Sequence, residues 1–534
     1  MVAAGIALTT VAILLLVGPV FAAPASAVLG TPDSEGPGHV VALALSLIGG
    51  NPWLLPEVPG ALNPIRANIT PMATLLGWPF YAALGGLRGA ALAWNAQWLV
   101  VSLAGSVGAW LFVRDWLGAA APAAVAAALV ASATSLHELP AVGRLEELAL
   151  YAWPLHVALL YRAVVLRPGW PSVAAAAVSF ASIAVEGGFA SIYLACVEVP
   201  LAAALLRAAP DRRRAAQALS VVALAGILAL APFVWAHLEY PSPPQVHPHR
   251  GKTVVGLAQL LPGGGNIPWR QGYHVRPYPG LALLSLAALA ALVDRRARPW
   301  LLGGLTVLVL SLGPTLVWTP DSEAIVSLPA RWIGAAIPSL PMTAWNRMGA
   351  LIVPMLAFSG AALAARWRWT GWILLLAAVE HLAEGRPSGT RSWGIEPPPA
   401  LAAALYDGGL VQLPDDDLAM LWQHSVPAGQ PAEPIFPDEP VLLAWLRSLA
   451  PTPVTKMRTR LPATTNLDPT CVAFGAETLR GAGFQTIALR TDDVAPEAAA
   501  RIDRTLTLAP GPPRRASGVT PWPPTPRFPG EACP

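Results

Sequence analysis

Charge is scarce in this sequence. Lys, Arg, Asp and Glu make up only 12% of its 534 residues, whereas ordinary soluble domains carry about 25%. The charges nearly cancel, with a formal net charge of +3. No basic tract alternates with aromatic residues, so the sequence predicts no nucleic-acid partner.

Cysteine is also scarce, and this excludes a common kind of metal site. The chain has only Cys196, Cys471 and Cys533, and their spacing matches no metal-binding motif. An oxidising compartment would permit a Cys471–Cys533 disulfide, and the sequence leaves that bridge open.

Apolar residues are abundant instead, at 54% with a mean hydropathy of +0.52. A bilayer core about 30 Å thick needs roughly 20 apolar residues per helix, and this length predicts an all-α polytopic membrane domain, residues 1–385, with about eleven transmembrane helices. The predicted spans are Gly5–Val28, Ala90–Val113, Trp116–Ser135, Leu148–Leu166, Pro171–Glu186, Phe189–Leu206, Ala215–His237, Gly280–Val293, Trp300–Val317, Gly349–Ala365 and Gly371–Leu382.

The apolar run Met72–Leu87 is ambiguous because Gly and Pro interrupt it. Lys and Arg concentrate in cytoplasmic loops, and this rule decides the case. If Met72–Leu87 is one of several interfacial helices in residues 40–87, and the N-terminus is inside, nearly all short basic turns fall on one side. Those turns contain Arg114, Arg162, Arg167, Arg207, Arg212, Arg213, Arg214, Arg295, Arg296, Arg298, Arg366 and Arg368.

The N-terminal run can be a cleaved signal peptide or a permanent helix. Ala25–Ala27 resembles a signal-peptidase site, but no Lys or Arg precedes the apolar run Ala3–Ala23, which is long for a signal peptide. We therefore predict a retained helix that tethers Asp33 and Glu35 at the outer face.

Beyond residue 385 the sequence becomes polar. A Pro/Gly-rich linker begins there, and with an odd number of spans the C-terminal part lies outside the cytoplasm. "GLVQLP" and "FQTIALRTDD" are typical of strands, while "EPVLLAWLRSLA" and "APEAAARIDRTL" are typical of helices. We predict a small extracytoplasmic α/β domain over residues 386–509 and a Pro-rich tail, 510–534, without stable structure.

Ionisable side chains gather in the predicted outer loops, where they are candidates for function. A carboxylate there could act as a general base, and Arg or Lys could hold a lipid phosphate. Glu186 lies at a predicted span end, where it could reach the interface. The candidate catalytic residues are Asp33, Glu35 and Glu138, and the candidate substrate-binding residues are His39, Glu147, Arg250, Lys252, Arg270, Arg276 and Arg347.

The layout resembles that of bacterial membrane glycosyltransferases of the GT-C fold, in an uncharacterised subgroup. The stretches that carry the resemblance are "GTPDSEGPGH", "TPMATLLGWPFYAALGGLRGAALAWNAQWLV", "GAWLFVRDWLGAAAPAAVAAALV", "LEELALYAWPLHVALLYRA" and "LSLGPTLVW…LPMTAWNRMGALIVPMLA". They cover most of residues 1–385 as weak patterns. The resemblance implies a polyprenyl-phosphate sugar donor, membrane lipid as a partner and a place in the bacterial inner membrane.

The same resemblance assigns roles to acidic residues. Asp33 matches the family's catalytic base, with Glu35 as a substitute, and Glu138, Glu146 or Glu147 matches a second acidic position. No cofactor is implied, and a divalent metal is left open. The sugar, which can be a hexose or a pentose, and the acceptor are not specified by the sequence.

Two alternatives of other classes stay open at this point. A transporter or flippase of lipid-linked intermediates would place charges near the bilayer midplane and would commonly contain internal repeats. A non-catalytic membrane assembly protein would use the C-terminal domain as an adaptor.

Overall fold

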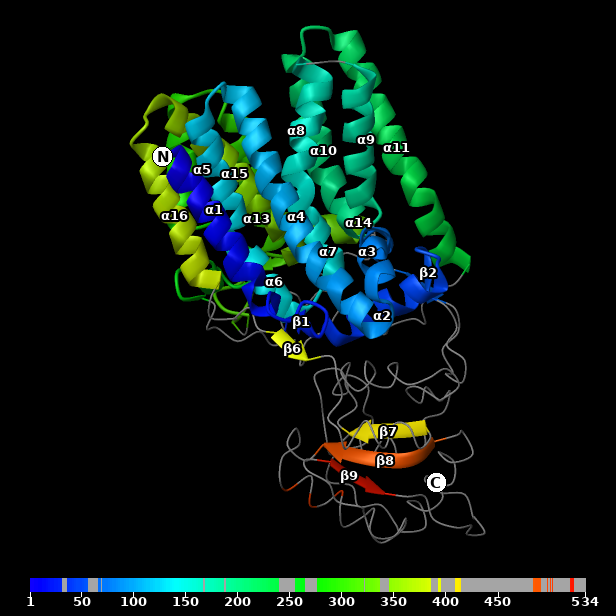
Figure 1. The fold of residues 1–534 in the computed structure, drawn as a ribbon. Coiled ribbons are helices and arrows are strands. Elements are labelled where there is room, and N and C mark those ends of the chain that lie inside the picture. The colour runs from blue at the N-terminus through cyan, green and yellow to red at the C-terminus, as the bar shows by residue number, and fades with distance from the viewer. Residues whose placement is uncertain are drawn as a thin grey trace.

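The computed structural model is a bundle of long helices with a small group of strands beyond one end (Figure 1). It describes residues 1–30, 36–55, 66–68, 70–166, 169–186, 189–239, 255–264, 276–320, 322–336, 345–385, 392–394, 409–413, 484–490, 497, 500, 502 and 519–522. Every predicted span overlaps a helix of the bundle. Six of the described helices are long and apolar enough to cross a membrane, so the chain is a multi-pass membrane protein, and the count of about eleven spans stays a prediction.

Helices pass along the bundle in alternating directions. Those that overlap predicted spans are α1 (Val2–Val17), α4 (Gly86–Leu117), α5 (Ala120–Ala131), α8 (Trp153–Tyr161), α9 (Trp170–Ala184), α10 (Phe189–Ala208), α11 (Arg212–Glu239), α12 (Leu281–Val293), α13 (Arg298–Ser311), α15 (Ile352–Arg366) and α16 (Thr370–Gly385). Shorter elements connect them: η1 (Gly18–Val20), α2 (Gly36–Gly49), α3 (Pro71–Leu84), α6 (Thr134–Val142), α7 (Leu145–Leu148), η2 (Ala149–Ala152), the π-helix η3 (Arg162–Leu166), η4 (Leu257–Leu260), α14 (Pro329–Ala336) and η6 (Trp345–Leu351).

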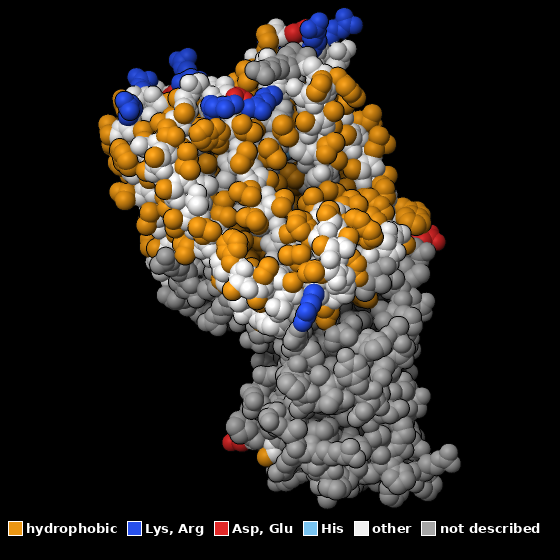
Figure 2. Space-filling view, in the orientation of Figure 1, with side chains coloured by type: hydrophobic (Ala, Val, Ile, Leu, Met, Phe, Trp, Pro, Cys, Tyr) orange, Lys and Arg blue, Asp and Glu red, His pale blue; other side chains and the backbone are white. Residues whose placement is uncertain are grey.

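The two ends of the bundle differ in charge. Helices α4, α10 and α15 each finish in a turn that contains an arginine, Arg114, Arg207 and Arg366 respectively. Figure 2 shows Lys and Arg side chains mostly at the upper end, above an apolar belt. We call this the arginine end. The other end, which holds Glu138, Glu147 and Glu384, is called the acidic end.

The length of helix α4 argues against an additional membrane span at Met72–Leu87. Its 32 residues span about 48 Å at 1.5 Å per residue, which exceeds a hydrocarbon core of about 30 Å. Helix α3 packs antiparallel on the first turns of α4: Gln97 Nε2 donates to the Ala73 carbonyl at 3.0 Å. Figure 1 places α3 beside α2, near the acidic end. This arrangement agrees with an interfacial helix.

Several predicted boundaries were wrong. The predicted span Trp116–Ser135 begins inside the last turn of α4, where Gly118 adopts a left-handed conformation, φ 69°, and ends the helix. The span Trp300–Val317 is helical only to Ser311, and Thr315–Leu316 forms strand β4, which pairs antiparallel with β5 (Val326–Ser327). Strands β2 (Leu54–Leu55) and β3 (Arg66–Ala67) pair in the same way.

The segment after α1 is fixed to the bundle. Strand β1 (Ala27–Leu29) pairs antiparallel with β6 (Ser392–Gly394). Asn95 of α4 accepts from the Leu29 N–H at 3.0 Å and donates to the Ala27 carbonyl at 2.7 Å. The stretch Ala25–Ala27, which resembles a cleavage site, therefore leads directly into a paired strand that begins at Ala27, and this agrees with the prediction of a retained α1.

The described C-terminal residues include a three-stranded sheet in the order β7–β8–β9. The strands β7 (Gly409–Leu413) and β8 (Phe484–Arg490) run parallel, at the two positions where the sequence predicts strands. The strand β9 (Val519–Trp522) pairs antiparallel with β8. Part of the tail after residue 510 therefore forms regular structure. The predicted helix "EPVLLAWLRSLA" lies outside the described residues, and the domain boundaries stay predictions.

Candidate functional site: an apolar cavity beside a cluster of arginines

An apolar cavity of about 490 Å³ lies between α10 and α13. Its wall on α10 runs from Cys196 to Ala208, which is about 18 Å along a helix. Several of its lining residues are exposed at the surface of the bundle, among them Cys196, Pro200 and Leu302. The cavity therefore opens at the side of the bundle, and a cavity with this shape and apolar lining suits a lipid chain.

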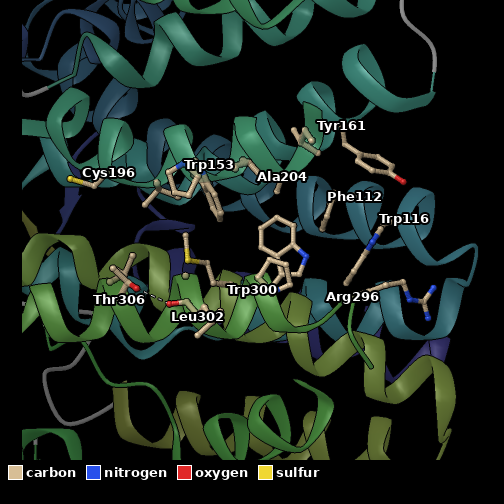
Figure 3. A pocket seen from close by; sticks show the side chains of 18 of the residues that line it. Phe112, Trp116, Trp153, Tyr161, Cys196, Ala204, Arg296, Trp300, Leu302 and Thr306 are labelled. Atoms are coloured by element: carbon tan, nitrogen blue, oxygen red, sulfur yellow. Dashed lines mark hydrogen bonds between the residues drawn. The ribbon is translucent and has the colours of Figure 1, made fainter. Parts of the chain in front are cut away.

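Aromatic rings form much of the wall (Figure 3). At the arginine end the cavity is lined by Trp116, Tyr161 and Arg296. Farther in, the Trp153 and Trp300 rings lie with their centroids 6.5 Å apart. Such packed rings supply a large apolar surface with few conformational states, which gives the cavity a defined width.

A cluster of two arginines and one carboxylate adjoins the other end of the cavity. Met348 of η6 lines the cavity, and its neighbour Arg347 has Nε 3.0 Å from Oε1 of Glu147. Arg144 binds the same oxygen through Nη1 at 3.2 Å. Tyr193, one turn before the cavity wall on α10, is buried and interacts electrostatically with all three side chains. We call these residues the Arg347 cluster.

The predicted site residues Glu138 and Arg276 bind each other. Glu138 Oε1 accepts from Arg276 Nε at 2.6 Å, and Oε2 accepts from the Arg276 backbone N–H at 2.9 Å. The same guanidinium donates to the carbonyl of Glu384 at 2.8 Å. Arg276 and Glu138 are both buried, so a catalytic Glu138 would have to give up one of these bonds. In this structure Arg276 ties α6 to the end of α16.

Further polar contacts surround this pair. Tyr278 donates to Glu380, and burial together with that hydrogen bond raises the pKa of the Tyr278 hydroxyl, so it stays a donor. Thr134 donates to the His381 carbonyl at 2.9 Å. These bonds join α6, α16 and the segment before α12 into one rigid support at the acidic end.

The remaining predicted residues fall into two groups. Asp33, Glu35, Arg250, Lys252 and Arg270 lie outside the described residues. His39 lies near the start of α2 and is half-buried.

Glu186 is buried rather than reaching the interface. It accepts from the Met72 N–H at 2.9 Å at the start of α3. A carboxylate stabilises the positive end of a helix dipole, so Glu186 anchors the N-terminus of α3.

The sequence analysis missed Glu198 and His156, which lie inside predicted spans. Glu198 of α10 accepts from the Trp153 indole N–H at 2.7 Å, and His156 of α8 has Nε2 3.4 Å from the same carboxylate. A lone ionisable residue within a span is a functional candidate by default. That signal was present in the sequence, but a hydropathy window averages one carboxylate over about 20 residues.

Among the described residues, no three His, Cys, Asp or Glu side chains are close enough to hold a metal ion together. The question of a divalent metal therefore stays open, because the predicted acidic loop with Asp33 and Glu35 is not described.

Comparisons with known proteins bear on the fold. No protein-family model matches the chain, and no curated protein sequence matches it. A crystal structure of the Archaeoglobus fulgidus oligosaccharyltransferase in the apo form matches with a TM-score of 0.51 at 11% identity, covering 96% of this chain and 71% of that one. The same enzyme tethered to an acceptor peptide with the sequon NVT matches with a TM-score of 0.50 at 12% identity, with 95% and 71% coverage. At this level of identity the likeness shows the fold alone, and the chain has the GT-C-like fold of these membrane oligosaccharyltransferases.

Proposed function

We propose that the chain transfers a sugar from a polyprenyl-phosphate donor to an acceptor at the acidic end of the bundle. The observation that carries the proposal is that the Arg347 cluster adjoins the apolar cavity, because Met348 lines the cavity and its chain neighbour Arg347 belongs to the cluster. An isoprenoid tail would lie in the cavity, and the phosphate would bind the arginines at its end. The similar fold of an oligosaccharyltransferase supports this reading.

The chemistry of the cluster suits a lipid phosphate. Arg144 and Arg347 share the single carboxylate of Glu147, so these three side chains carry a net positive charge. Guanidinium groups bind phosphate with two parallel hydrogen bonds, and charge of this sign also stabilises a phosphate leaving group. The cluster would therefore bind the donor and assist departure of the lipid phosphate.

Asp33 is the proposed general base, which takes the proton from the acceptor hydroxyl, and Glu35 is its substitute. The chain that leads to Asp33 is fixed, because β1 is bound to Asn95 of α4 and to β6. In the proposal this end of the bundle faces outward from a bacterial inner membrane, since the arginine end would lie in the cytoplasm.

The test is sugar transfer in isolated membranes from radiolabelled polyprenyl-phosphate hexoses and pentoses. The variant Arg347→Ala should reduce kcat/KM by about 10- to 100-fold, because hydrogen bonds to charged groups contribute about 1.5–3 kcal/mol. Arg347→Lys should lose less, since it keeps the charge but not the paired donors. Arg368→Ala, at an exposed arginine of the other end, serves as the control and should match the wild type.

A flippase is the second candidate. The sideways opening of the cavity between α10 and α13 and the Glu198–His156 pair within the bundle are features that a lipid transporter would also use. Liposomes that contain the protein separate the two functions. Movement of a lipid phosphate between leaflets, with no transfer from any donor in the panel, would favour the flippase and reject the enzyme.

A further inference from the structure

A polar cluster crosses three helices behind the wall of the cavity. The Trp153 indole N–H donates to Glu198 Oε1 at 2.7 Å, and His156 Nε2 lies 3.4 Å from Oε2. On the far side of the ring, His156 Nδ1 is 3.0 Å from Ser179 Oγ of α9. His156 is fully buried. A charge in such surroundings is costly unless it is compensated.

The contacts of Ser179 favour one arrangement of protons in the cluster. Its hydroxyl donates to the Ala176 carbonyl at 2.9 Å, so its only proton is committed and its oxygen accepts from His156. His156 Nδ1 therefore carries a hydrogen. Without a further proton, His156 Nε2 and the nearest oxygen of Glu198 would face each other with lone pairs. One additional proton on either atom removes this repulsion.

The opposite arrangement is less favourable. If Ser179 donated to His156 Nδ1, the Ala176 contact would lose its hydrogen, and the carboxylate of Glu198 would stay as an uncompensated charge within the bundle. Such a charge costs several kcal/mol. With the extra proton, the pair is neutral as a whole, either as imidazolium and carboxylate or as imidazole and carboxylic acid.

We propose that Glu198 and His156 are positioning residues for the lipid cavity: they hold one proton between them, and through the Trp153 hydrogen bond they fix the indole as the cavity wall. This inference rests on the proposed function. Trp153 lines the cavity and packs near Phe358, with ring centroids 6.2 Å apart. Release of the indole would let it turn and change the width available to a tail.

The test uses variants that separate hydrogen bonding from charge. In Glu198→Gln the amide oxygen still accepts from Trp153, and the amide N–H can donate to a neutral His156 Nε2, so every contact is kept. Glu198→Ala removes both contacts. Trp153→Phe keeps a ring but loses the donor to Glu198, and it leaves the contact between Glu198 and His156 in place. Glu239→Ala, exposed at the end of α11, is the matched control.

The measurement is cross-linking of a photoactivatable farnesyl phosphate in membranes, with the labelled peptides of α10 and α13 identified by mass spectrometry. Glu198→Gln and Glu239→Ala should label like the wild type. Glu198→Ala and Trp153→Phe should label about tenfold more weakly at the same probe concentration, because a buried partner is left unsatisfied. In the transfer assay these two variants should raise the donor KM and leave kcat unchanged.

The outcomes distinguish this inference from the proposed function. If the probe labels α10 and α13 in the wild type and labels Trp153→Phe equally well, the positioning role is rejected and the proposed lipid site is retained. Equal losses in Glu198→Gln and Glu198→Ala would also reject the role, because the amide keeps the geometry. If the wild type does not label these helices at all, the lipid site itself is rejected, and this inference with it.

Discussion

Three buried or largely buried carboxylates at the acidic end, Glu138, Glu147 and Glu384, are each held by an arginine. Each pair joins elements that are far apart in the sequence. The arginines therefore determine how the site is assembled, whether or not they also touch a substrate.

Arg276→Ala should be strongly destabilising. It would leave Glu138 buried without its cation, and breaking a buried ion pair costs about 3–5 kcal/mol. Thermal unfolding of the detergent-purified protein measures this loss as a lower Tm. The control Arg368→Ala replaces an exposed arginine and should leave Tm nearly unchanged. Equal Tm values for the two variants would show that the Arg276 contacts are not structural.

Asp33→Asn should abolish most of the activity without affecting expression. It keeps the size of the side chain but removes its basicity, and a positioned general base contributes about 10²–10⁴-fold in rate. The initial rate of sugar transfer is the measurement. Glu35→Gln should cost less, because Asp33 is the proposed base and Glu35 is only its substitute. A near-wild-type rate in Asp33→Asn would remove its proposed role.

At the scale of elements, hydropathy predicts where the helices are but not where they end. The boundary between α4 and α5 depends on Gly118 and its positive φ, which a sliding average does not register. The predicted span Leu148–Leu166 contains a change from 3₁₀ to α to π geometry, and such changes follow from packing. Averaging hydropathy over a window also concealed Glu198. The basic turns could be recognised because their arginines lie close together in the sequence.

The candidate site was predictable only in part. Glu147 and Arg347 are 200 residues apart in numbering, and the sequence placed both at the outer face without indicating that they bind each other. The cavity was not predictable at all, because its wall consists mostly of apolar residues that resemble those of any other predicted span. Pairing across helices depends on rotation about their axes, which apolar spans do not specify.

Close packing between α4 and α8 gives a prediction at this scale. A Cβ added to Gly108 would lie 2.1 Å from the backbone nitrogen of Leu155, so Gly108→Ala must push α8 and its Trp153 away from α4. Overpacking of this kind typically costs about 1–3 kcal/mol. Gly334→Ala in α14 is the control, since nothing lies within 4 Å of its added Cβ. If both variants unfold at the same temperature, the α4–α8 contact is looser than described.

The distribution of charge predicts how the whole molecule is oriented in the membrane. Arginines gather at one end of the bundle (Figure 2), and such ends face the cytoplasm. Reporter fusions at residue 212 should therefore be cytoplasmic, and fusions at residue 450 should be outside. The opposite pattern would place the Arg347 cluster at the cytoplasmic side of the membrane. The sugar donor would then have to be available on that side.

The central claim is that the cavity and the Arg347 cluster hold one lipid phosphate. The most direct measurement is a cryo-electron microscopy structure of the full chain with a non-transferable polyprenyl-phosphate sugar analogue. The account predicts tail density between α10 and α13, and phosphate density within hydrogen-bond distance of Arg144 and Arg347. Lipid density elsewhere on the bundle, with the cavity empty at saturating analogue, would contradict it.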